Sequence, residues 1–125
     1  EAVYYGLKFL YKRYKKPIVI TENGTAQNDC VCLDGKVHDT YRIDHTARYL
    51  MQMKKAVNEG IPVNGYYHWA LTDNFEWRCG FSKRFGLIFV DYETQRRIRK
   101  DSFYFYKKVI ATNGDNLNKP EEFFK

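Results

Sequence analysis

The sequence contains no long hydrophobic run, and none of its apolar stretches approaches the roughly 20 residues that a membrane-spanning helix requires. We therefore expect no membrane partner. Cysteine is also scarce: Cys30, Cys32 and Cys79 are too few for a disulfide framework, and a Cys-x-Cys spacing is too short for the usual zinc arrangements. With no secretory signal peptide and no metal-binding spacing among its histidines, the sequence predicts reduced thiols, a cytoplasmic location, no metal and no other cofactor.

A nucleic-acid recognition module is absent as well, although basic residues are in excess. The formal net charge is +6, and the cations occur in short runs over residues 12–16, 96–100 and 107–108. Lysine and arginine side chains are mostly exposed in folded proteins, so we interpret each run as a solvated face. The sequence therefore predicts no nucleic-acid partner.

Aromatic residues, by contrast, are abundant. Eleven tyrosines, nine phenylalanines and two tryptophans exceed what the core of a 125-residue chain needs. Aromatic-rich surfaces are common where a ligand or another protein segment binds, so the excess indicates a missing partner surface. Glu1 already lies inside a helical pattern of apolar residues, and we expect the chain to be part of a longer protein.

Apolar periodicity predicts three helices and two strands. The first helix ends before Pro17, and Asp39 and Asp101 can cap the other two. The expected helices cover about residues 1–15, 40–59 and 101–114, the strands 18–20 and 63–71, and a surface hairpin 86–99. The inner face of the middle helix is expected to carry Ile43, Ala47, Leu50, Met53 and Val57.

The order of these elements is typical of a parallel sheet wrapped by crossover helices, which is an α/β fold. Residues 18–20 form an unbroken apolar run, as expected for a strand buried on both faces. Two strands cannot close a barrel, and an eight-stranded barrel usually takes about 250 residues. We therefore predict the C-terminal portion of a (β/α)8 TIM barrel, with its last two parallel strands, three helices and a surface β-hairpin. Residues 1–114 would form this segment, and residues 115–125 a polar tail.

A carboxylate, Glu22, stands at the end of the first predicted strand. In parallel α/β folds the carboxyl ends of the strands form the active face, because the loops converge there on a rigid base. We expect Glu22 to be partly desolvated and oriented by its neighbours, as a nucleophile or a general acid/base must be. The alternative is a structural role, in which Glu22 caps the strand or pairs with a lysine.

A second cluster of polar and aromatic residues follows the second predicted strand. Trp69 lies inside that strand, and Glu76 and Trp77 lie in its exit loop. Flat aromatic rings and a bidentate acceptor match the apolar face and hydroxyl rim of a sugar. The alternative for the two tryptophans is core filling. Two such elements after consecutive strands favour a carbohydrate site.

Three motifs carry a resemblance to a known family. They are ITENG at residues 20–24, GYYHWALTDNFEW at residues 65–77 and RFG at residues 84–86. Together they closely resemble the C-terminal part of family 1 glycoside hydrolases, the β-glucosidase family, from the first helix to about Gly114. The resemblance implies retaining hydrolysis of a β-glucoside or related β-glycoside, in which Glu22 attacks the anomeric carbon and water then hydrolyses the glycosyl-enzyme intermediate.

The same resemblance assigns sugar contacts to four residues. Trp69 would stack on the sugar beside the nucleophile, Glu76 would accept hydrogen bonds from the outer hydroxyls, and Trp77 would donate to another. Phe85 would line the pocket. The phospho-glycosidase branch of the family has serine, lysine and tyrosine where Glu76, Lys83 and Phe85 stand, and only Lys83 fits. A carboxylate at position 76 would repel a sugar phosphate, so unphosphorylated glucosides, galactosides or fucosides are expected.

The sequence departs from the family in one essential part of the site. The general acid/base of the family lies in an Asn-Glu-Pro motif on an earlier strand, and this sequence contains none. The nearest imitation, at residues 58–60, is expected to end a helix on the opposite side of the sheet. Without an acid about 5 Å from Glu22 the leaving oxygen cannot be protonated, so we expect the chain alone to be nearly inactive. A missing N-terminal barrel segment, in the same or another chain, is its expected partner.

Other interpretations stay open at this level. A truncated product could bind carbohydrate or another partner without turnover, or could assemble only by swapping with an intact barrel. Residues Arg78 and Cys79 stand where small or acidic residues are expected, which leaves the aglycone side undetermined. Asn23, Asp73 and Asn74 match the family motifs, and we interpret them as supports of the loops. His68 is expected to be a packed, hydrogen-bonded strand residue.

Overall fold

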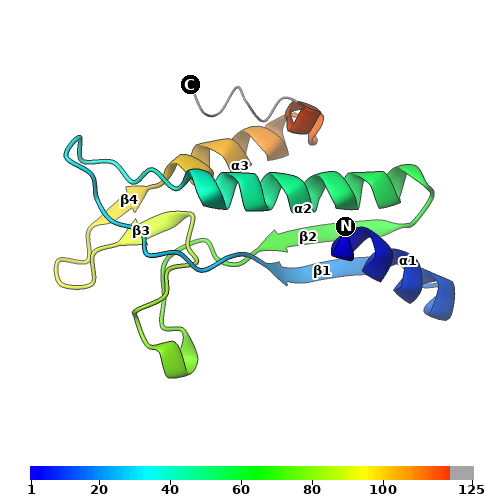
Figure 1. The fold of residues 1–125 in the computed structure, drawn as a ribbon, viewed down its shortest axis with the longest axis horizontal. Coiled ribbons are helices and arrows are strands. Elements are labelled where there is room, and N and C mark those ends of the chain that lie inside the picture. The colour runs from blue at the N-terminus through cyan, green and yellow to red at the C-terminus, as the bar shows by residue number, and fades with distance from the viewer. Residues whose placement is uncertain (119–125) are drawn as a thin grey trace.

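The computed structural model describes residues 1–118 and places three helices, a parallel strand pair and an antiparallel hairpin along the chain (Figure 1). The α-helices are α1 (Ala2–Tyr14), α2 (Thr40–Asn58) and α3 (Asp101–Ala111). The strands are β1 (Ile18–Asn23), β2 (Val63–His68), β3 (Ile88–Val90) and β4 (Arg97–Arg99), and the short 3-10 helices are η1 (Trp77–Cys79) and η2 (Asp115–Asn118). The predicted α/β order of helices, strands and hairpin is confirmed.

The β1 and β2 strands are parallel neighbours joined by α2, and α2 and α3 lie side by side over them (Figure 1). Within residues 1–118 each of these two strands has one unpaired edge. β3 and β4 form a separate antiparallel pair. Among the described helices, none is long and apolar enough to cross a membrane.

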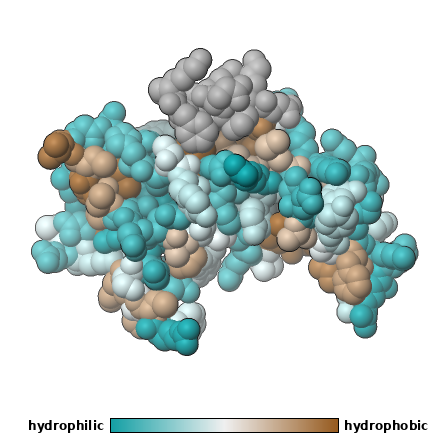
Figure 2. Space-filling model, in the orientation of Figure 1, coloured by the Kyte–Doolittle hydropathy of each residue, from teal (hydrophilic) through white to brown (hydrophobic). Residues whose placement is uncertain are grey.

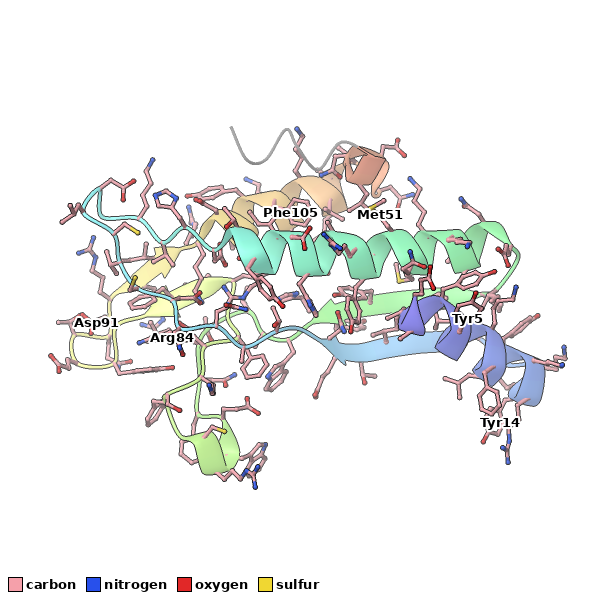
Figure 3. The ribbon with its side chains drawn as sticks, in the orientation of Figure 1. Tyr5, Tyr14, Met51, Arg84, Asp91 and Phe105 are labelled. Carbon is pink, nitrogen blue, oxygen red and sulfur yellow. The ribbon has the colours of Figure 1, made fainter. Side chains whose placement is uncertain are left out.

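Two apolar clusters hold the helices to the sheet. One joins α2, α3 and η2 through Ile43, Ala47, Leu50, Phe105, Val109 and Leu117. Figure 3 shows Phe105 where α3 faces α2. The other joins α1 to the last turn of α2 through Tyr4, Leu7, Ala56 and Ile61. Within each helix the residues of a cluster are spaced three or four apart, which places them on one face of the helix.

The predicted inner face of α2 is correct except at its end. Val57 is 42% exposed, whereas its neighbour Ala56 is fully buried. This difference arises because the last turn of α2 packs against Tyr4 and Leu7 of α1, so the buried face turns toward that helix. A polar tail was expected from residue 115, but Leu117 in η2 is buried in the core. The rest of that tail, residues 119–125, lies outside the described part of the chain.

The two predicted helix caps are wrong in detail. The Asp39 carboxylate does not cap α2, and its Oδ1 accepts a hydrogen bond from the backbone N–H of Ser102 in α3 at 2.8 Å. The N-cap position of α3 is Lys100, and the carboxylate of Asp101 instead contacts Nδ1 of His38 at 2.6 Å. Both aspartates therefore tie the start of α3 to the segment that leads into α2.

The first strand is exposed on one face, although we predicted burial on both. Ile18 and Ile20 pack toward the helices, while Val19 is 48% exposed. No described element covers the other face of the sheet. The second strand is shorter than predicted, since it ends at His68 and leaves Trp69 just beyond it. Figure 2 shows apolar surface on the lobes formed by α1 and by the loop around η1.

Candidate active site

Glu22 lies in an irregular stretch of β1. Ile20 pairs with Tyr66 and Asn23 pairs with His68, so three steps along β1 match two along β2. Such an extra residue is a β-bulge, which redirects side chains. Ile20 packs toward the helices, and Asn23 accepts a hydrogen bond from the Tyr66 hydroxyl at 2.8 Å on that same side. Glu22, between them, therefore points to the face of the sheet away from the helices.

The Glu22 side chain is exposed, whereas we expected partial desolvation. The reason is that no described element covers the face onto which it points. No described residue forms an ion pair or hydrogen bond with its carboxylate, so the alternative pairing with a lysine is not seen in residues 1–118. The carboxylate is free to meet a ligand or another part of the protein.

The Trp69 segment lies next to the Glu22 segment, and the Phe85 segment lies next to that of Trp69. The backbone N–H of Trp69 donates to the carbonyl of Asn23 at 2.9 Å, and the N–H of Ala70 donates to the carbonyl of Phe85 at 3.1 Å. Trp69 and Phe85 are both half-buried. Gly24 allows the closest approach, because a Cβ there would lie 1.8 Å from the Trp69 carbonyl oxygen. Three motif segments thus run side by side at the carboxyl end of the sheet.

Glu76 and Trp77 lie on a separate lobe that extends from this end of the sheet (Figure 1). Trp77 is 80% exposed, which excludes the core-filling alternative for this tryptophan. The Oε2 atom of Glu76 is buried and has no hydrogen-bond partner among the described residues. A buried acceptor without a partner carries a free-energy cost unless a ligand or water satisfies it. Within residues 1–118 the Trp69 and Trp77 rings do not contact each other.

The lobe is held by three aromatic rings. The rings of Phe75 and Phe81 meet edge to face with centroids 5.5 Å apart, and Phe81 lies 4.5 Å from Tyr92. Phe75 and Phe81 are more than half exposed, so this packing takes place on the surface. The backbone N–H of Glu76 closes the loop by donating to the carbonyl of Gly80 at 2.7 Å.

Asp73, which was predicted only to support a loop, is buried and forms ion pairs. The Asp73 side chain is fully buried and contacts Arg84 at 2.7 Å and Lys100 at 2.8 Å. Its Oδ1 also accepts from the backbone N–H of Gly86 at 2.9 Å. The prediction that the run at residues 96–100 is solvated is wrong for Lys100, which is fully buried.

Lys100 and Arg42 extend these contacts to the loop before α2. Lys100 Nζ lies 2.5 Å from Asp29, and Arg42 lies 2.8 Å from the same carboxylate. Arg42 also pairs with Asp39 and is fully buried. Sequence reasoning overlooked Arg42, although one signal was present: at the helical repeat, it lies beside the apolar face of α2 that begins with Ile43.

His68 and Tyr66 are shielded from water behind the sheet. Burial, the largest cause, lowers the pKa of His68 to about 4, so the imidazole is neutral near pH 7. Its ring packs against Tyr106 with centroids 5.7 Å apart, as predicted, and its interaction with the backbone of Phe85 partly opposes the lowering of the pKa by burial. Burial also raises the pKa of Tyr66, which keeps the hydroxyl protonated as the donor to Asn23.

The Asn-Glu-Gly sequence at residues 58–60 is a helix end, as predicted. Glu59 follows the last residue of α2, and its carboxylate accepts from the Tyr4 hydroxyl at 2.7 Å and from Lys8 at 2.9 Å. It lies at the end of the sheet opposite the carboxyl end of β1 (Figure 1). Among residues 1–118, no group of three His, Cys, Asp or Glu side chains has an arrangement that could hold a metal ion.

Known proteins match nearly the whole chain. Residues 1–115 match the glycosyl hydrolase family 1. The chain is 50% identical to β-glucosidase A of Thermotoga maritima over 115 residues, which are 91% of this chain and 26% of that protein. It is 49% identical to a bifunctional β-D-glucosidase/β-D-fucosidase of Bifidobacterium breve over 89% of this chain and 25% of that protein. An aryl-phospho-β-D-glucosidase of Bacillus subtilis is 40% identical over 90% of this chain and 24% of its own length.

Solved structures give the same result. The chain is similar to a family 1 β-glucosidase from Thermotoga maritima in complex with isofagomine lactam, with a TM-score of 0.88 over 90% of this chain and 26% of that one. This chain thus spans about a quarter of the length of the relatives it matches. On the motifs, the arrangement of the strands and these matches, the chain belongs to glycosyl hydrolase family 1.

Proposed function

We propose that this chain forms the C-terminal quarter of a (β/α)8 barrel that hydrolyses β-glycosidic bonds with retention of configuration. The observation that carries the proposal is the position of Glu22, which the bulge in β1 turns to the free face of the sheet, next to the Trp69 segment. The family is shown by the comparisons, and several of its members that resemble this chain are named β-glucosidases.

Glu22 would act as the nucleophile of a double displacement. Its carboxylate attacks the anomeric carbon, the bond to the aglycone oxygen breaks, and that oxygen takes a proton from a general acid. That group, now a base, takes a proton from a water molecule whose oxygen attacks the anomeric carbon of the glycosyl ester; the sugar gains its hydroxyl and Glu22 leaves as a free carboxylate. The acid is not part of this sequence, and general acid catalysis is worth about 10² to 10⁴-fold. The chain alone should therefore be nearly inactive.

Four side chains would bind the sugar. The half-buried Trp69 and Phe85 would cover its apolar face, and the exposed ring of Trp77 would approach from the lobe. The unpartnered Oε2 of Glu76 is an acceptor for a sugar hydroxyl. The Glu76 carboxylate would repel a phosphate group on the sugar. We therefore propose unphosphorylated β-glucosides or related β-glycosides as substrates.

The partner of this chain would be the preceding part of the barrel, in the same or another chain. That part would dock onto this chain at the unpaired edges of β1 and β2 and at the exposed side chains of Val19 and Tyr67. Unpaired parallel strands with an apolar face are normally covered in α/β proteins. We propose neither a nucleic-acid nor a membrane partner. The thiols of Cys30, Cys32 and Cys79 are free, which supports the proposed cytoplasmic location.

A chimeric enzyme tests this proposal. This chain replaces the matching C-terminal quarter of Thermotoga maritima β-glucosidase A, and hydrolysis of an aryl β-glucoside is measured. The expected result is hydrolysis with retention by the chimera and no detectable hydrolysis by the 125-residue chain. An inactive chimera that is nevertheless folded, as judged by its circular dichroism and thermal transition, would contradict the proposal.

A second candidate is sugar binding without turnover by the chain alone. It is favoured by the unpartnered Glu76 Oε2 and the exposed Trp77 ring, which need no acid to contact a sugar. Trp69 and Trp77 are the only tryptophans, so quenching of their fluorescence by glucose or cellobiose would report binding directly. Unchanged emission up to saturating sugar would exclude this candidate.

A further inference from the structure

Six charged side chains form a continuous chain of ion pairs, which we call the network, next to the candidate site. Three are carboxylates and three are cations, so their formal charges cancel. The members of the network are Asp29, Asp39, Asp73, Arg42, Arg84 and Lys100. Arg84 is 17% exposed, and the other five are between 0% and 4% exposed. Figure 3 shows Arg84 beyond the carboxyl end of β1, on the side of the β3–β4 hairpin.

The network joins parts of the chain that are far apart in sequence. Lys100, which precedes α3, lies 2.8 Å from Asp73 in the loop after β2 and 2.5 Å from Asp29 in the loop after β1. Arg42 in α2 contacts the same Asp29 at 2.8 Å. The loops that leave both parallel strands are thereby attached to two helices.

Phe85 is held from both sides by these charges. The carbonyl of Arg84, just before it, accepts a hydrogen bond from Arg42 Nη2 at 2.8 Å. The backbone N–H of Gly86, just after it, donates to Asp73 Oδ1 at 2.9 Å. The carbonyl of Phe85 itself accepts from the N–H of Ala70, the neighbour of Trp69, at 3.1 Å. The position of Phe85 relative to Trp69 is thus set by the network.

The backbones of these segments touch without space for a side chain. A Cβ on Gly86 would lie 2.2 Å from the Asp73 nitrogen and 2.7 Å from the Ile88 carbonyl oxygen. Asp73 also begins the loop that leads to Glu76 three residues later. A change in the Asp73 carboxylate would therefore act on Phe85 and on the Glu76 lobe together.

We propose that Asp73 is a positioning residue: through the buried network it holds Phe85 and the Glu76–Trp77 lobe in register with Trp69, so that the sugar pocket is formed before substrate arrives. This role rests on the proposed function. A buried ion network is weak support for stability, since apolar replacements of similar volume are often as stable. In some proteins such buried ionic groups instead specify one arrangement of the chain, and this is the role we assign to the network.

The two tryptophans allow the positioning to be measured without catalysis. Trp69 and Trp77 supply the only indole N–H signals in a ¹⁵N spectrum of the 125-residue chain, and both are proposed sugar contacts. Asp73→Asn should shift or broaden both signals at temperatures where the variant is still folded. The control is Leu50→Ala, which removes apolar contacts from the cluster between α2 and α3. It should lower the melting temperature without shifting the indole N–H signals.

Kinetics in the chimeric enzyme supply the second readout. A misplacement of about 1 Å can cost about 10²-fold, so we expect Asp73→Asn to lower kcat/KM by about 10 to 100-fold. Asp73→Glu, which keeps the charge, should recover part of this loss, while Leu50→Ala should keep kcat/KM within a factor of about three at a temperature where it is folded.

The outcomes separate the positioning role from the proposed function. Indole signals that move no more in Asp73→Asn than in Leu50→Ala would overturn the positioning role, whether or not the chimera is active. An inactive unsubstituted chimera would instead contradict the proposed function, while the indole spectra would still decide the role of Asp73.

Discussion

The backbone N–H of Trp69 donates to the carbonyl of Asn23 at 2.9 Å, and this hydrogen bond joins the two motifs that the sequence separates by more than forty residues. It continues the β1–β2 pairing beyond the last residue of β2. The proposed nucleophile, Glu22, and the proposed sugar platform, Trp69, therefore sit on adjacent backbone segments. Their relative position depends on the sheet itself and not on a mobile loop.

Gly24 makes this close approach possible, so Gly24→Ala should destabilise the chain. A Cβ would lie 1.8 Å from the Trp69 carbonyl oxygen, and forcing atoms into a packed region costs about 1–3 kcal/mol. The free energy of unfolding in urea measures the loss. The matched control is Gly6→Ala in α1, where no atom lies within 4 Å of the new Cβ. That change should leave stability equal or raise it by about 0.5–1 kcal/mol. Equal effects at the two positions would contradict the account.

Asp73→Asn should cost more than a typical surface change. Removing one partner of a buried ion pair leaves an uncompensated charge, at a cost of about 3–5 kcal/mol. The control is Asp115→Asn, because Asp115 is 87% exposed and lies 3.5 Å from Lys54. An exposed pair of this kind is worth about 0–1 kcal/mol. Urea denaturation measures the free energy of unfolding of both variants. If Asp73→Asn lowers it no more than Asp115→Asn does, the network is not needed for stability.

The outcome for this network shows where sequence reasoning stops. The helices were predictable because apolar residues spaced three and four apart lie on a single face of a helix. The burial of Lys100 was not, since its partners Asp29 and Asp73 lie 71 and 27 residues away along the chain. The strand-end rule correctly placed Glu22 and Trp69 near each other. It could not reveal the bulge that turns Glu22, because a bulge is defined by pairing with the partner strand. The roles of the site residues stay predictions.

His38 should make stability depend on pH above 6.5. Its ring nitrogens lie 2.6 Å from Asp101 and 3.0 Å from Asp34, and the hydrogen bond with Asp101, followed by that with Asp34, raises the pKa of His38 above its ordinary value of 6.5. A raised folded-state pKa means that this stabilisation is fully present below pH 6.5 and is lost as pH rises through the folded pKa. The urea midpoint of the chain should therefore fall as pH rises above 6.5.

The control for this prediction is His38→Gln, which removes the titrating group. The slope of the urea midpoint above pH 6.5 should flatten in that variant. His68 does not interfere in this range, because its lowered pKa of about 4 makes the folded state lose stability only as pH falls from 6.5 toward 4. An unchanged slope above pH 6.5 in His38→Gln would rule out His38 as the cause.

Trp77→Ala should separate binding from folding. Because the side chain is 80% exposed, its removal should change the free energy of unfolding by no more than about 0.5 kcal/mol. In the chimeric enzyme the same change should raise KM or lower kcat/KM by about 10-fold, since one hydrogen bond to the sugar is lost. Leu33→Ala, at a fully exposed position in the loop before α2, is the matched control. Wild-type kinetics in Trp77→Ala would remove this residue from the site.

The most direct test of the account replaces the proposed nucleophile in the chimeric enzyme. Glu22→Gln keeps the shape of the side chain but removes the charge that attacks the anomeric carbon, and Glu59→Gln makes the same change at the opposite end of the sheet. Loss of the nucleophile should lower kcat for an aryl β-glucoside by at least about 10³-fold, since covalent catalysis is abolished. The Glu59→Gln enzyme should keep its kcat. Full activity in Glu22→Gln, or equal losses in the two variants, would contradict the assignment of Glu22 as the nucleophile.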